Sequence, residues 1–232
     1  MSDQTKALIK DAATQLFYAN GFHGTSVRDI AKKAKVNQAL ISYYYGGKQA
    51  LFESLVTEFF EGYVHTIETT LHACQDDATK ALREIIERVL TYQQSCHLLA
   101  RMAHREMTLD STLVRELMST YLRKEQYLLE QVVAGCMAQL KQNKLPVDLV
   151  VLQLRNMLIL PYSSPQYLRE LFLLTPADHL FTKRYVQHTQ AWMKTVFQLP
   201  EKNTEVSSVT CVIDRHLQEV QKQSERQNHK QA

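Results

Sequence analysis

Glycine and proline are scarce in this chain, with six glycines and five prolines among 232 residues. No proline occurs before Pro146, so nothing of that kind interrupts a helix over the first half of the sequence. An all-β chain needs many tight turns and would contain more of both residues. We therefore expect an all-α fold.

The residue patterns of common active sites and metal sites are also missing. There is no HExxH, no glycine-rich phosphate loop and no GxSxG, and the nine histidines are scattered. The four cysteines lie far apart without a CxxC pair, which favours free thiols in a reducing compartment. We expect no enzyme activity, no cofactor and no metal. The alternative is a zinc site built from Cys74 and His72, or from Cys96 and His97.

Long apolar runs are absent as well. No segment approaches the length of a membrane span, and the opening MSDQTKALIK lacks the apolar region of a signal peptide. Apolar residues make up 45% and charged residues 22%, which is ordinary for a globular protein with a core. The sequence predicts a cytoplasmic protein without a membrane contact.

Positive charge is concentrated at the amino-terminal end. Residues 1–48 contain seven lysines and arginines but only three aspartates, a net charge of +4. The whole chain carries +3, so the remaining residues sum to −1. This distribution predicts that any contact with nucleic acid lies in the first fifth of the chain.

The stretch Thr25 to Lys48, TSVRDIAKKAKVNQALISYYYGGK, has the pattern of two short helices joined by a tight turn. Val27, Ile30 and Ala34 recur at helical spacing in the first helix, and Ser26 precedes it as an amino-terminal cap. The second helix would bury Leu40, Ile41 and Tyr45 and expose Asn37, Gln38, Ser42, Tyr43 and Tyr44.

Those exposed residues are neutral hydrogen-bonding groups, and cations surround them: Arg28, Lys32, Lys33, Lys35 and Lys48. Cations hold phosphates while neutral polar groups meet base edges, as a helix in the DNA major groove requires. The alternative is an ordinary helical corner with a solvated basic face. Three consecutive tyrosines, about 100° apart on a helix, cannot all be buried, which favours the DNA interpretation.

Residues 5–60 resemble the DNA-binding domain of the TetR family of bacterial regulators. The resemblance rests on Phe17, Asn20, Gly21 and Phe22, then Gly24, Thr25 and Ser26, then Ile30, Ala31, Ala34 and Val36, and finally the aromatic cluster and Lys48. It implies an N-terminal three-helix helix-turn-helix domain, a larger C-terminal helical dimerisation domain, and residues 37–44 as the recognition helix. Ser42, in place of the usual tyrosine, and Gly46-Gly47 depart from the family pattern. The implied DNA contacts are Thr25, Ser26, Arg28, Asn37, Gln38, Ala39, Ser42, Tyr43, Tyr44 and Lys48.

The rest of the chain continues the helical pattern, with helices predicted near 48–72, 78–95, 97–107, 111–141, 147–160 and 178–198. We expect the DNA-binding domain over 1–48, the helix 48–72 as the link, a dimerisation and regulatory domain over 49–200, and a polar tail over 201–232. The last two helices are rich in apolar residues and would form a four-helix dimer interface. A homodimer on palindromic double-stranded DNA, associated with the nucleoid, follows.

Longer runs, such as HREMTLDSTLVRELMSTYLRKEQY and LPYSSPQYL, resemble regulators of the cell-division protein FtsZ in endospore-forming bacilli. That resemblance implies an effect on FtsZ assembly during sporulation. The candidate surface for such a partner is Glu53, Glu61, Arg105, Arg115 and Glu116. The alternative is a ligand-responsive repressor of the TetR type, with a small molecule, of unknown identity, bound among Met102, Met107, Met118, Tyr121 and Phe172.

Overall fold

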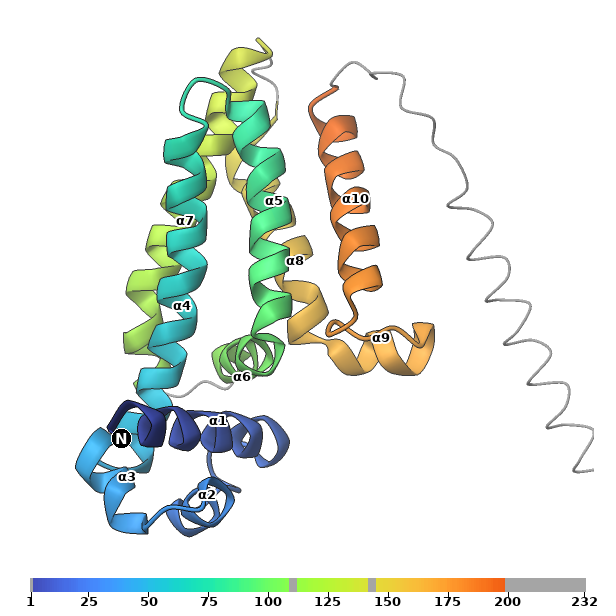
Figure 1. Ribbon diagram of the computed structural model, residues 1–232. Helices are drawn as coiled ribbons and strands as arrows, with labels where there is room; N and C mark the ends of the chain where they lie inside the picture. Colours follow the sequence, from blue (N-terminus) through green and yellow to red (C-terminus); the bar gives the residue numbers. More distant parts are fainter. Residues whose placement is uncertain (1, 109–111, 142–144, 199–232) are drawn as a thin grey trace, which may run out of the picture. The chain divides into compact units, whose positions relative to one another are not determined.

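A computed structural model describes residues 2–108, 112–141 and 145–198. These residues form ten α-helices and no strand, which confirms the all-α prediction (Figure 1). None of the described helices is long and apolar enough to cross a membrane. The helices are α1 (Ser2–Asn20), α2 (Val27–Ala34), α3 (Gln38–Tyr45), α4 (Lys48–Ala73), α5 (Ala78–Ser95), α6 (His97–Thr108), α7 (Thr112–Gln139), α8 (Val147–Ser163), α9 (Pro165–Phe172) and α10 (His179–Val196).

Local capping sets the bounds of the short helices α2 and α3. The Ser26 hydroxyl accepts a hydrogen bond from the Asp29 amide, and the Asp29 carboxylate accepts one from the Ser26 amide, a complete capping box. Asn37 caps α3 through the Ala39 amide. Gly46, at φ 76°, ends α3 in the left-handed conformation that glycine adopts at low cost. The turn between the two helices is therefore specified within a few residues.

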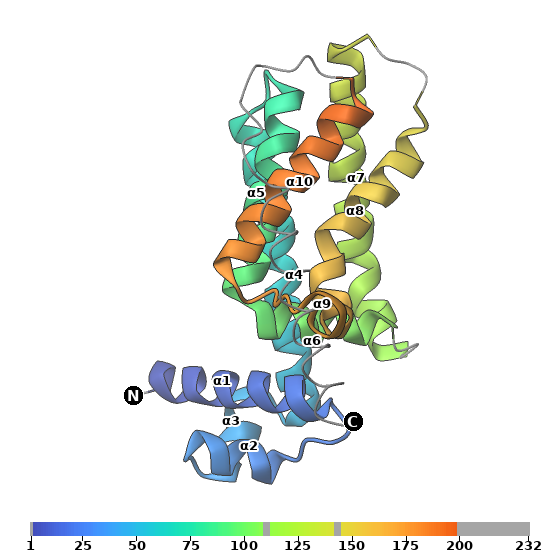
Figure 2. The same cartoon turned by 90° about the vertical axis from the view of Figure 1, so that its right-hand side faces the viewer.

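The helix α4 connects the amino-terminal helices to the rest of the structure. Its first turns pack against α1 and α3, and its later turns pack against α5, α6 and α7 (Figures 1 and 2). Its buried side chains follow the predicted i, i+4 series: Leu51, Leu55, Phe59, Tyr63 and Ile67. The 26-residue helix thus contributes to the core at both of its ends.

The remaining helices form a bundle in which α5 is central. It contacts α4, α6, α7, α8 and α10, and buries Ile85, Ile86, Val89 and Leu90. Figure 2 shows α8 and α10 running along the same side of the bundle. The helices α7 and α8 pack against each other, and α9 lies beyond the end of α8.

The structure corrects the prediction that the eighth helix ends at Pro161. The helix continues through this proline to Ser163. Proline has no amide hydrogen, so the carbonyl of Met157, four residues earlier, loses its usual donor. The Tyr185 hydroxyl of α10 donates to that carbonyl at 2.9 Å and takes the place of the missing donor. The sequence also does not predict the short helix α9, because the prolines around it indicate a break.

Residues 1–197 form one compact unit. A division of function between residues 1–48 and 49–200 remains a proposal, with α4 shared by both parts. The predicted tail, 201–232, lies outside the described residues.

Candidate nucleic-acid interface

The helix α3 exposes the neutral face that the sequence predicts. Tyr43 is 79% exposed, and Gln38, Ala39 and Ser42 are exposed beside it. Exposed neutral side chains can meet base edges in the major groove without first breaking a strong internal contact. This face is the geometric centre of the candidate interface.

Two of the three consecutive tyrosines attach α3 to α1 instead of facing outward. The Tyr45 hydroxyl donates to the Lys6 carbonyl at 3.1 Å, and the Lys6 ammonium lies 5.6 Å from the centre of the Tyr44 ring. Tyr44 is half-buried and contacts the ring of Tyr43 edge to face, with centroids 5.0 Å apart. Of the three, Tyr43 is the one presented to solvent, while its neighbours orient the helix.

The predicted cations flank this face as expected from their positions. Arg28 is exposed, and Lys32, Lys33 and Lys35 lie on or just after α2 at its surface. Asp29 is an acidic residue among these cations. Hydrogen bonds from Ser26 hold the pKa of its carboxyl below the usual value, and the charges of Lys32 and Arg28 add to this effect. Asp29 therefore stays ionised and caps α2, while the lysines and arginine are available to phosphates.

Ser26 and Asn37 lie at helix starts, where their side-chain oxygens already accept backbone amides at 3.1 and 2.9 Å. The Ser26 hydroxyl donates its one hydrogen to the Asp29 carboxylate at 2.5 Å, so this side chain has none left for a phosphate. Asn37 keeps its side-chain amide group as a donor, so its predicted DNA contact is compatible with the cap.

Thr25 is in a different environment from its neighbours. It is 2% exposed, and its hydroxyl points at the carbonyls of Gly21 and Leu16, 2.9 and 3.2 Å away. A hydroxyl has one hydrogen to donate, so this side chain has none left for a phosphate. The structure gives Thr25 the role of joining the end of α1 to the start of α2, and argues against the side-chain DNA contact that the resemblance implied.

Lys48 also makes internal contacts. Its ammonium donates to the carbonyls of Phe22 and Thr25, both at 3.0 Å, and lies 4.2 Å from the centre of the Phe22 ring. An ammonium has three donors, so one remains for a phosphate. Lys48 thus connects the first turn of α4 to the segment before α2, which no sequence pattern indicated.

Known proteins that resemble this chain agree with this geometry. Residues 9–55 match the family model described as bacterial regulatory proteins, tetR family. The chain is also 42% identical over 199 residues to the probable HTH-type transcriptional regulator YttP of Bacillus subtilis (strain 168), covering 85% of this chain and 96% of that protein. The chain belongs to the TetR family. It is a DNA-binding transcriptional regulator and not an enzyme.

Two further likenesses support this assignment. The HTH-type transcriptional repressor NicS of Pseudomonas putida (strain KT2440) is 32% identical over 91 residues, 39% of this chain and 42% of that protein. The solved structure of the TetR family regulator PfmR from Thermus thermophilus superposes with a TM-score of 0.66 at 18% identity. That superposition covers 83% of this chain and 99% of PfmR and establishes the fold. These names state transcriptional regulation and say nothing of FtsZ or sporulation.

Of the residues predicted to form a partner surface, the three with described side chains each make contacts of their own. Arg105 of α6 donates to the carbonyls of Phe17 and Tyr18 at 2.7 and 3.3 Å, so it joins α6 to the end of α1. Glu53 accepts a hydrogen bond from Gln49, and Glu61 is exposed within 3.5 Å of the Tyr121 hydroxyl. The side chains of Arg115 and Glu116 lie outside the described residues.

The bundle buries a polar network that the sequence analysis missed. The Glu125 carboxylate, 3% exposed as a residue, accepts hydrogen bonds from the Tyr63 hydroxyl at 2.9 Å and from Arg155 Nε at 3.0 Å. The three residues come from α7, α4 and α8. No sequence signal could have found them, because their separations in the chain follow no period.

A second buried chain of hydrogen bonds joins α6, α5 and α8. Gln93 donates to the Leu158 carbonyl at 2.9 Å, and its oxygen lies 2.7 Å from His104 Nε2, which must therefore carry the hydrogen. Burial lowers the pKa of His104 to about 3, so the ring is neutral. Among the described side chains, His104 Nδ1 is a buried nitrogen without a hydrogen-bond partner.

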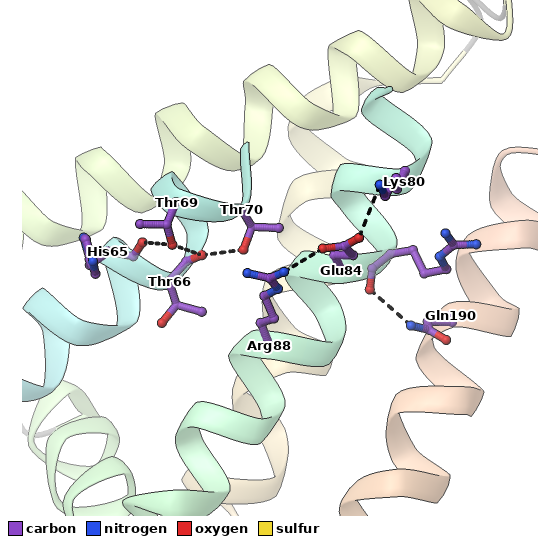
Figure 3. A network of polar contacts seen from close by, with 9 residues as sticks. His65, Thr66, Thr69, Thr70, Lys80, Glu84, Arg88 and Gln190 are labelled. Carbon is purple, nitrogen blue, oxygen red and sulfur yellow. Dashed lines mark hydrogen bonds and ion pairs between the residues drawn. The ribbon is translucent and has the colours of Figure 1, made fainter. Parts of the chain in front are cut away.

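The residues predicted to line a ligand site lie in different environments. Met102 and Met118 are buried in the core, whereas Phe172 on α9 is 51% exposed. An open groove of about 780 Å³ lies between α4 and α5. Figure 3 shows its polar lining, where Glu84 pairs with Arg88 at 2.9 Å and Gln190 of α10 donates to the Arg83 carbonyl. No three His, Cys, Asp or Glu side chains of the described residues are grouped to hold a metal ion.

Proposed function

We propose that this protein is a sequence-specific repressor that binds palindromic DNA as a homodimer and responds to a small molecule. The observation that carries the DNA-binding part is the neutral exposed face of α3, centred on Tyr43 and flanked by the cations of α2. The similarity to NicS, a transcriptional repressor, supports the direction of regulation.

Exposed apolar side chains support the homodimer. Leu149, Leu152 and Leu160 of α8 are 51%, 53% and 44% exposed, and Leu180 of α10 is 68% exposed. Exposed leucines on two neighbouring helices are expected where a partner covers them. Two recognition helices held by such an interface would read half-sites about one DNA turn apart.

The decisive experiment is recovery of the DNA bound by this protein across the genome of its host, with selection from random fragments by the purified protein. Palindromic sites in promoters, with transcription rising when the protein is absent, are the expected result. Failure to select any specific sequence would overturn the proposal. Tyr43→Ala is the matched control, since it should lose the selected sequence while the protein stays folded.

A second candidate function is the effect on FtsZ assembly during sporulation. It is supported by the resemblance of the runs between residues 104 and 168, and by the exposed carboxylate of Glu61 on α4. Sites spread by chromosome position with little change in nearby transcripts would favour it over the repressor. Glu61→Lys should then alter FtsZ polymerisation while DNA affinity is unchanged, and unaltered polymerisation with the unsubstituted protein would exclude direct contact.

A further inference from the structure

A small cleft lies where α1, α6 and α9 come together, away from the recognition helix. It has a volume of about 50 Å³, and its polar lining comes from Tyr18, His97, Arg101 and Arg169. Pro161, Tyr162 and the segment 174–177 form the rest of the wall. Figure 1 shows α6 and α9 at the same end of the bundle, the end nearer α1.

The lining is electropositive and contains no carboxylate. The residues that line the cleft include two arginines and a histidine but no Asp or Glu. Arg169 pairs at 3.2 Å with Glu170, its exposed neighbour on the same helix. Within the described part of the chain, Arg101 has no ion pair, and its guanidinium lies 5.5 Å from the centre of the Tyr18 ring.

The charges around the Arg101 guanidinium are mainly positive. Burial lowers the pKa of this guanidinium; Tyr18 opposes this effect, and the positive charges of Arg105 and Arg169 add to it. Of these two, Arg105 already pairs with Glu106 at 3.5 Å and donates to α1 carbonyls. Like charges converge here at a cost in free energy that an anion would remove.

We propose that this cleft binds a single anionic group, a carboxylate or phosphate of a small molecule, between Arg101 and Arg169. The planar guanidinium fork suits both groups, since it can donate two parallel hydrogen bonds. A volume of about 50 Å³ holds one such group and excludes a drug-sized molecule, whose remainder would extend into solvent. His97 adds a third donor at the start of α6.

The position suggests how such an anion would affect DNA binding. The cleft joins α9 and the 174–177 segment to α6, and the next turn of α6 holds the end of α1 through Arg105. An anion bound by both Arg101 and Arg169 would hold α6 against α9. It would thereby limit the movement of α6 together with α1. This regulatory consequence rests on the proposed function, whereas anion binding itself does not.

Thermal unfolding of the full-length protein tests the site directly. We expect the midpoint temperature to rise and saturate with inorganic phosphate or with acetate, relative to sodium chloride at equal ionic strength. A response to phosphate alone identifies a phosphate site, and a response to acetate alone identifies a carboxylate site. No rise above chloride with either anion overturns the proposal.

Variants place the bound anion. Arg101→Gln and Arg169→Gln should each weaken the apparent affinity about tenfold, as expected for loss of a charge-assisted hydrogen bond. Arg101→Lys keeps the charge without the fork and should lose less. Arg88→Gln removes an exposed charge of the α4–α5 groove and should change nothing. Equal loss in Arg88→Gln, or loss in Arg28→Gln on α2, would place the anion elsewhere and contradict the assignment.

DNA binding is measured separately on the selected operator, with and without saturating anion. A change in affinity that disappears in Arg101→Gln supports the regulatory consequence. Failure to select an operator would overturn the repressor while leaving the unfolding result readable. Saturable anion binding without any change in operator affinity would retain the site and reject its regulatory role.

Discussion

The two ends of α4 belong to regions that satisfy their polar groups in opposite ways. Around α2 and α3, the capping side chains accept hydrogen bonds from backbone amides two or three residues away, as in Ser26 with Asp29 and Asn37 with Ala39. In the bundle, Tyr63 reaches Glu125 and Gln93 reaches Leu158, 62 and 65 positions along the chain. The caps of the first region are specified locally, and its α3 face exposes neutral side chains to solvent. The second is specified by packing and buries polar side chains.

The difference also separates stability from recognition. The α3 face contributes little to folding because Tyr43 is exposed, so its substitution should affect DNA alone. The buried network affects folding because the loss of one partner leaves the other charge buried without compensation. Four predictions test this separation, in order of decreasing effect.

The largest effect is expected from breaking the buried ion pair. Arg155→Ala leaves the Glu125 carboxylate buried with Tyr63 as its remaining partner, and should lower the free energy of unfolding by about 3 kcal/mol in urea denaturation. The double variant Arg155→Met with Glu125→Gln should recover most of this loss. Arg88→Ala breaks an exposed pair with Glu84 and should change stability by less than about 0.5 kcal/mol. An equal loss of stability in Arg155→Ala and Arg88→Ala would contradict the special role of the buried ion pair.

Next comes the recognition face. Tyr43→Ala should weaken binding to the selected operator by about 10- to 100-fold, equivalent to roughly 1–3 kcal/mol, without lowering the unfolding midpoint. Fluorescence anisotropy on operator and scrambled duplexes measures the ratio. Tyr45→Phe removes the hydrogen bond to the Lys6 carbonyl and serves as the contrasting variant, with a loss of stability instead. Unchanged operator affinity in Tyr43→Ala would show that α3 is not the reading helix.

Lys48 is expected to contribute both to stability and to DNA binding. Lys48→Ala should lower the free energy of unfolding by about 1 kcal/mol, because two carbonyls lose a charged donor. It should also weaken all DNA sequences about equally and reduce the salt slope by roughly one unit, through the third donor. An unchanged slope with weaker binding would mean that Lys48 positions the segment before α2 and touches no phosphate.

The smallest effect is expected on the stability of the fold at acid pH. Hydrogen bonds from Ser26 to Asp29, and from Lys80 and Thr79 to Asp77, lower the folded-state pKa of each carboxyl below its unfolded value near 3.8. Their contribution to stability is therefore complete above that pH and is lost as the pH falls through the folded pKa. Asp29→Asn and Asp77→Asn should each flatten the acid limb of stability against pH. Carboxyl NMR titrations with raised pKa values would contradict both caps.

Much of the fold could be predicted because its signals are local. The bounds of α4, α5 and α6 lie within a residue or two of their predicted bounds, since i, i+4 spacing defines them and Asp77 caps α5. The helix α8 extends past Pro161 because Tyr185 replaces the missing backbone donor, and the same prolines conceal α9 from a local pattern. A contact from another helix cannot be read from residues a few positions apart.

The features of the candidate site also divide into those set by local sequence and those set by tertiary contacts. The amino-acid sequence by itself determined the helix-turn-helix, the neutral face of α3 and its surrounding cations, because each depends on spacing within a few turns. Only the tertiary structure decided that Thr25 and Arg105 serve internal contacts, that Lys48 holds two carbonyls, and that Arg101 and Arg169 share a cleft. Those roles depend on which helices pack together, and the free energy of packing is set by the whole core.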